Sequence, residues 1–107
     1  MIGEFEYLIL SSATRLGADA YGASIRSEIE KATGKKCSIG ALYTTLDRLE
    51  NKGFVTTWMG EPTRERGGRS KRLVQITATG VKEASDFFRA ISRISKGASW
   101  TTNRTTR

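Results

Sequence analysis

The sequence predicts a mainly α-helical fold with one small β-hairpin, and three observations support this. Apolar residues recur at steps of three and four along four stretches, which is the spacing of buried helix faces. Two β-branched and aromatic stretches, 54–59 and 72–77, have the character of strands. The length of 107 residues suits one domain and is too short for two ordinary ones. We therefore expect a single core.

Two helices are predicted in the first third of the chain. The first runs from Gly3 to Arg15 and is apolar on more than one side, so it should be buried against two neighbours. The pattern then breaks at residues 16–20. A second helix is expected from Tyr21 to Thr33, and Gly34 follows it at the position where glycine commonly ends a helix.

The stretch from Ser38 to Gly53 predicts the helix around which the chain is organised. Ser38 is a suitable N-cap and Gly53 a suitable C-terminal stop. Its apolar residues form one narrow stripe that should be buried: Ile39, Leu42, Leu46 and Leu49. The opposite face is small and polar, which suits a helix that enters the DNA major groove. The same pattern also fits any surface helix of a small bundle.

A basic hairpin is predicted directly after this helix. Its strands are Phe54–Met59 and Arg72–Thr77, and the tip between them contains proline, paired glycines and several cations. The basic residues of the tip are Arg64, Arg66, Arg69 and Lys71. Two helices joined by a short turn and followed by such a hairpin define a winged helix-turn-helix arrangement.

A last helix is expected from Thr77 or Thr79 to about Lys96. Its apolar face is broader than one small domain needs, so we expect a second subunit to cover part of it and of the first helix. The predicted dimer contacts are Phe5, Leu8, Ile9, Phe87, Phe88, Ile91 and Ile94. These patterns divide the chain into a winged-helix region (1–76), a C-terminal dimerisation helix (77–96) and a disordered tail (97–107).

Charge and composition narrow the function classes. The chain has 18 Lys plus Arg against 11 Asp plus Glu, a net charge of +7, which favours a polyanionic partner: nucleic acid first, a membrane surface second. Histidine is absent and Cys37 is the one cysteine, so the usual zinc sites and the Ser-His and Cys-His dyads cannot form within one chain. We expect no enzyme, metal or cofactor. The sequence shows neither an apolar run of about 20 residues nor a basic N-terminal start, which predicts a cytoplasmic protein with no membrane partner.

Three motifs carry a resemblance to a known family. The segment G-A-L-Y-T-T-L-D-R-L-E-N-K-G-F-V (40–55), the basic G-G-R-S-K-R (67–72) and Q-I-T-A-T-G (75–80) resemble the PadR family of bacterial winged-helix regulators, from about Phe5 to the final helix. The resemblance implies a homodimeric transcription factor, usually a repressor, with dimer contacts from the first and last helices and sometimes a small-molecule effector at the dimer interface. It also implies Tyr43 and Thr44 at the DNA surface, with Arg69 and Lys71 near phosphate.

The sequence thus predicts a sequence-specific DNA-binding regulator that represses as a homodimer by occupying a promoter. The alternative is a winged-helix module that binds an acidic protein. In addition to the tip cations, the predicted contacts to double-stranded DNA are Ser38, Gly40, Ala41, Tyr43, Thr44 and Arg48. Tyr43 fits a ring at the core edge as well as a hydroxyl that reaches phosphate. Arg48 fits a guanine reader and a solvent-exposed charge lattice equally well.

Three further side chains have two interpretations each. Trp58 and Trp100 could stack a flat effector, but packing for Trp58 and disorder for Trp100 are the favoured interpretations. Cys37 could be a redox sensor beside a basic pair, but a small half-buried filler before a helix is the commoner role.

Overall fold

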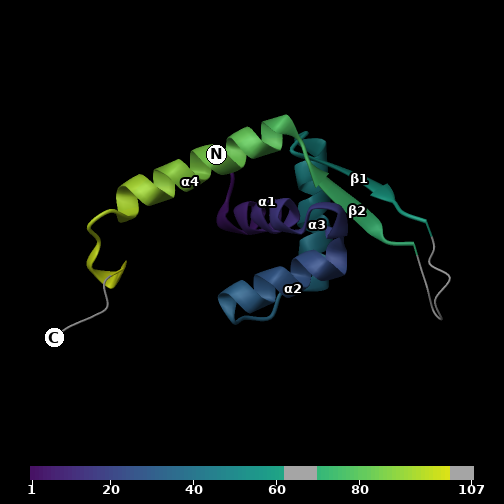
Figure 1. The fold of residues 1–107 in the computed structure, drawn as a ribbon, viewed down its shortest axis with the longest axis horizontal. Coiled ribbons are helices and arrows are strands. Elements are labelled where there is room, and N and C mark those ends of the chain that lie inside the picture. The colour runs from purple at the N-terminus through teal and green to yellow at the C-terminus, as the bar shows by residue number, and fades with distance from the viewer. Residues whose placement is uncertain (62–69, 102–107) are drawn as a thin grey trace.

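The computed structural model describes residues 1–61 and 70–101, and Figure 1 shows how their helices and strands are arranged. The elements in chain order are α1 (Glu4–Leu16), a 3₁₀ helix (Gly17–Asp19), α2 (Gly22–Thr33), α3 (Ile39–Asn51), β1 (Val55–Met59), β2 (Arg72–Ile76), α4 (Ala78–Ser95) and a 3₁₀ helix (Ser99–Thr101). The predicted fold class, mainly α-helical with a small antiparallel hairpin, is confirmed.

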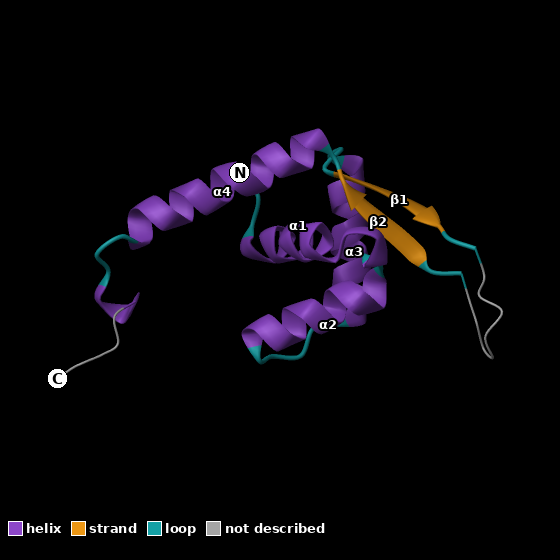
Figure 2. Ribbon diagram, viewed as in Figure 1, coloured by secondary structure: helices purple, strands orange, loops and turns teal. Residues whose placement is uncertain are grey.

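The core lies among α1, α2, α3 and the hairpin, and β2 lies beside the end of α1 (Figure 2). The largest side chains in it are fully buried: Ile9, Leu10, Ile25, Leu42, Leu46, Leu49 and Val55. Three of these come from the predicted stripe of α3, so the inner face of that helix is fixed by apolar burial.

The prediction that Ile39 belongs to this buried stripe is wrong. Ile39 is the first residue of α3 and is 40% exposed, so burial of the stripe begins at Leu42, one turn further along the helix. A correction also applies to Ile9, which is fully buried in the core of its own chain. It therefore has no surface left for a second subunit.

The hairpin is held through β2, which is paired along both of its edges. Its strands pair antiparallel from Val55 opposite Ile76 to Met59 opposite Arg72. The free edge of β2 is extended by the segment before α2, because the Val74 N–H donates to the Ala20 carbonyl at 2.9 Å and Tyr21 forms a bridge with Leu73. The base of the wing is thus fixed to the start of α2.

A compact junction joins the end of α3 to the start of α4. The Thr77 N–H donates to the Phe54 carbonyl at 3.0 Å, and the Thr77 hydroxyl donates to the Gly53 carbonyl at 2.7 Å. The same hydroxyl accepts from the Gly80 N–H and caps α4. Gly80 passes so close to the Phe54 carbonyl that a Cβ would overlap it. This geometry gives a physical reason for the spacing of threonine and glycine in Q-I-T-A-T-G.

Helix α4 runs past α1 and away from the hairpin (Figure 1). Its first half packs on α1, where the rings of Tyr7 and Phe87 lie 5.0 Å apart. After it, Ser99–Thr101 forms a short 3₁₀ helix where irregular tail was expected, and Trp100 is exposed. The rest of the predicted disordered tail, 102–107, lies outside the described residues. Over residues 1–61 and 70–101, no helix combines the length and apolar character needed to cross a bilayer.

Cys37 is buried in the turn between α2 and α3. Burial raises the pKa of its thiol, and the Glu30 carboxylate raises it further, while Arg26 acts in the opposite direction. Because the thiolate is the reactive form, these surroundings favour the role of a packed filler over that of a redox sensor.

An ion pair between a buried carboxylate and a partly exposed lysine ties α1 to the C-terminal end of α3. Glu6 accepts from the Gly3 N–H at 3.0 Å and from Lys52 Nζ at 2.8 Å. Burial raises the pKa of Glu6, but the hydrogen bonds from Lys52 and Gly3 outweigh burial, together with the charges of Lys52 and Arg48. The pKa of Glu6 is therefore lower than that of an ordinary glutamate. The carboxylate is therefore charged at neutral pH and holds the end of α3.

Replacing Lys52 with methionine should destabilise the protein in a pH-dependent way. The variant leaves a buried carboxylate without its cation, which should lower the free energy of unfolding by about 1–2 kcal/mol at pH 7, given that Lys52 is partly solvated. Because the pair lowers the pKa of Glu6, its contribution is complete above the unfolded pKa and disappears as pH falls through the folded pKa. Urea unfolding at pH 7 and pH 2.5 measures both values, with Lys96→Met as a control. An equal difference from wild type at both pH values would contradict this assignment.

Candidate nucleic-acid interface

The outer face of α3 is a row of small and polar residues. Gly40, Thr44, Asp47 and Asn51 follow one another at helical spacing, and all four are exposed. None of them has a bulky apolar side chain, so the backbone of α3 can approach another surface closely. This row has the size and hydrogen-bonding groups needed to contact base edges in a major groove.

The amino end of α3 is also exposed and is well capped. The Ser38 hydroxyl accepts from the Ala41 N–H at 3.2 Å, which confirms the predicted N-cap. Ser38 and Ala41 are both solvent-accessible. The predicted DNA-facing residues from Ser38 to Thr44 therefore lie on one exposed end of the helix.

The wing is fixed to α3 by Arg72, whose role the sequence did not reveal. Its Nη2 lies 2.8 Å from Asp47 Oδ1 and 3.2 Å from Glu50 Oε1, although only 21% of the Arg72 side chain is exposed. Glu50 also accepts from the Thr57 hydroxyl at 2.9 Å. These contacts place one cation beside the two acidic groups of α3 and so reduce the repulsion that they would exert on a polyanion.

Tyr43 lies where the wing, α2 and α3 meet. Its ring covers Gly22 so closely that a Cβ there would overlap it, and 37% of Tyr43 stays exposed. The Arg72 guanidinium carbon lies 6.0 Å from the centre of the Tyr43 ring, and Lys71 Nζ lies 4.4 Å from the centre of the Tyr21 ring. Tyr43 thus packs at the core edge and still presents surface next to Arg72 of the wing.

Arg48 lies on the other flank of α3. It is exposed, and its charge contributes to the lowered pKa of Glu6, which places it toward the amino end of α1. It makes no ion pair within the described residues. The remaining predicted wing cations, Arg64, Arg66 and Arg69, lie outside the described residues.

Two exposed lysines next to this surface were not among the predicted contacts. Lys35 and Lys36 lie in the turn that leads into Ser38. In the sequence they form the basic pair beside Cys37. Their signal was available, since two adjacent cations precede a helix N-cap directly.

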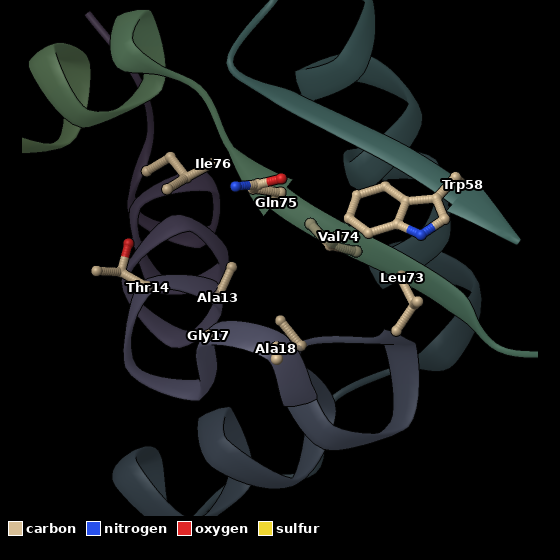
Figure 3. A pocket seen from close by; sticks show the side chains of 10 residues that line it. Ala13, Thr14, Gly17, Ala18, Trp58, Leu73, Val74, Gln75 and Ile76 are labelled. Carbon is tan, nitrogen blue, oxygen red and sulfur yellow. The ribbon is translucent and has the colours of Figure 1, made fainter. Parts of the chain in front are cut away.

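A groove of about 430 Å³ lies between the end of α1 and the hairpin (Figure 3). Ala13 and Thr14 line its α1 side, and Trp58 and Gln75 line its hairpin side. Trp58 is 46% exposed, so the favoured interpretation of hydrophobic packing holds for only part of the ring. Two further grooves, between α1 and α4, are bordered by Tyr7 and Phe88.

Taken together, these features define the class of protein: a winged helix with an exposed, capped third helix and a hairpin clamped beside it. The transcriptional regulator PadR-like family model matches residues 9–86. The chain belongs to this family, whose members are transcriptional regulators and not enzymes.

Solved structures share the fold. A PadR family transcription regulator from Clostridium difficile R20291 has a TM-score of 0.72 at 22% identity, covering 92% of this chain and 98% of its own. A transcriptional regulator from Clostridium thermocellum has a TM-score of 0.71 at 23% identity, covering 92% of each chain. Bacillus subtilis PadR in complex with operator DNA has a TM-score of 0.64 at 22% identity, covering 79% of this chain and 46% of its own. No curated protein matches in sequence.

Proposed function

We propose that this regulator binds operator DNA as a homodimer and represses transcription by occupying a promoter. Each α3 would enter one of two successive major grooves, about 34 Å apart, with the wings on the flanking backbone. The observation that carries the proposal is the exposed row of Gly40, Thr44, Asp47 and Asn51, set between cations of the wing and of the α2–α3 turn. B. subtilis PadR, which shares the fold, was solved in complex with operator DNA.

The homodimer is supported by an apolar surface that the chain itself does not cover. Helix α4 exposes 48% of Val81, 58% of Phe88, 47% of Ile91 and 79% of Ile94 along one side. Phe5 and Leu8 of α1 are partly buried beside it, and Phe87 connects the two helices. A face of this extent on a small protein is typical of an interface, and a second copy would cover it.

A small-molecule effector fits the same region. The two grooves between α1 and α4 have volumes of about 340 and 250 Å³, and Phe88 contributes to both. A second copy on this face would close them into an enclosed site. An effector bound there would act on the dimer and, through the Glu6–Lys52 pair and the Thr77 junction, on the end of α3.

Replacing Thr44 with valine should change which bases are preferred. The two side chains have nearly the same shape, and residue 44 is exposed, so stability should stay within about 0.5 kcal/mol. Loss of the hydroxyl should remove about 1 kcal/mol of discrimination at one base pair of each half-site. Selection of bound duplexes from a random pool, run on both proteins, measures the change. Identical preferences would remove Thr44 from base recognition.

Replacing Lys71 with alanine is the matched contrast. Loss of a phosphate contact should weaken binding to all sequences about equally and flatten the salt dependence of binding.

The selection on wild type also tests the function itself. A palindromic winner, bound about 10³-fold or more above random duplex, would support the proposal. A ratio near one would overturn it and favour an acidic protein partner.

A further inference from the structure

We propose that the turn between α2 and α3 is a further DNA-binding element, in which Lys35 and Lys36 contact phosphates beside the groove that the start of α3 enters. The inference rests on the proposed DNA binding and adds to the contacts expected from α3 and the wing. It is carried by the fixed backbone of the turn, by the unpaired charge of the two lysines and by their position next to Ser38.

Side-chain hydrogen bonds hold the turn on both sides of the lysines. On one side, Gly34 has φ 71°, and the Lys35 N–H donates to the Thr33 hydroxyl at 3.1 Å. On the other side, the Cys37 N–H donates to Glu30 Oε2 at 2.8 Å, and the Cys37 carbonyl accepts from Arg26 Nε at 2.8 Å. A segment held in this way loses little further backbone freedom when it binds.

The two lysines keep their charge available. Both are exposed, and neither forms an ion pair within the part of the chain that the structure describes. They border a shallow depression with Arg26 and Glu30. The Glu30 carboxylate is already engaged there, because it lies 3.7 Å from Arg26 Nε and accepts the Cys37 N–H. The net charge that this turn presents to solvent is therefore positive.

The position of the turn identifies the ligand. Lys36 lies two residues before Ser38, the N-cap of the helix whose exposed row faces the groove. The amino end of a helix carries partial positive charge, which adds to the attraction for a phosphate. Any duplex that admits this end of α3 brings a strand of its backbone within reach of lysine side chains at this point. Ammonium groups bind phosphate as point charges and release counterions when they do so.

The test compares the double variant K35A/K36A with wild type on a fluorescein-labelled duplex recovered by wild type from the random pool. Anisotropy titrations across a salt series give the affinity and its salt slope. In a dimer the variant removes four cations, so the slope should flatten by about 3–4. Affinity near 150 mM salt should fall about tenfold or more.

Two matched variants separate a local contact from net charge and from folding. R93A/K96A removes two cations of α4 that have no ion-pair partner within the described residues, and it should change the slope far less. K35R/K36R keeps the charge and should keep the wild-type slope. The proposal fails if K35A/K36A matches R93A/K96A, or if the arginine variant is as weak as the alanine one. If K35A/K36A keeps the affinity and salt slope of wild type while wild type still selects a palindrome, only the inference about the turn fails. If wild type binds all duplexes alike, the proposed function fails with it.

Discussion

Replacing Phe88 with aspartate should convert the proposed homodimer into monomers and lower the affinity for a palindromic duplex by about 10²–10⁴. Phe88 is 58% exposed and lies between the two α1–α4 grooves, so a charge there would be buried against the second copy. The loss of affinity follows because two linked half-site contacts become independent ones, which removes the high effective concentration of the second. Sedimentation equilibrium and anisotropy on the same samples measure both effects.

The matched control is Arg93→Gln, which lowers the net charge of the same helix by the same amount. Residues 88 and 93 are about 140° apart around a helix with 3.6 residues per turn, so residue 93 points away from the apolar face. This variant should remain a dimer and bind as wild type does. If Phe88→Asp stays dimeric at micromolar concentration, or binds the palindrome with unchanged affinity as a monomer, the α4 face is not the interface that DNA binding requires.

Local sequence signals were sufficient to find the helices. Ser38, Gly34 and Gly53 mark helix ends through chain chemistry that acts within a few residues, and the observed ends of α2 and α3 agree with them within one or two positions. The repeats of apolar residues likewise identified the core face of α3. Both signals arise within one segment and do not depend on how segments pack.

The burial of Ile39 and Ile9 was predicted wrongly because it depends on how separate segments pack against one another. Ile39 continues the apolar stripe in sequence, but 40% of it stays exposed, whereas Leu42, one turn further along α3, is fully buried. Ile9 and Phe5 belong to one broad apolar helix, and only the arrangement of α1 against α2 and α3 decides which of them is fully buried. The periodicity of apolar residues gives the direction in which a side chain points. It does not show whether another element of the fold covers that side chain.

The candidate site was predicted where it is continuous in sequence. Residues 38–44 follow one another along α3, so their common exposure could be foreseen. The Arg72 contacts to Asp47 and Glu50 could not, because they require the register of β1 with β2 and the packing of the hairpin on α3. Arg48 is similar, since its flank is defined by the position of Glu6 on a different helix.

Replacing Gly80 with alanine should lower the free energy of unfolding by about 1–3 kcal/mol, although alanine is the better helix former. The new Cβ would overlap the Phe54 carbonyl and approach the Ile76 side chain. A backbone carbonyl that already accepts the Thr77 N–H cannot move aside without breaking that hydrogen bond. The start of α4 would have to shift away from the end of α3. Urea unfolding measures the loss.

The same substitution at Gly40 should have the opposite sign. A Cβ there would meet nothing closer than the Ser38 hydroxyl at 3.9 Å, so Gly40→Ala should stabilise α3 by a few tenths to about 1 kcal/mol.

The DNA affinity of the folded Gly80→Ala protein separates two roles of the junction between α3 and α4. If Thr77 and Gly80 only close the fold, affinity per folded dimer stays at the wild-type value. If Thr77 and Gly80 also fix the position of α3 relative to α4, the affinity for DNA should fall although no DNA-facing residue has changed. The reason is that the two recognition helices of the proposed dimer would no longer match the spacing of successive grooves.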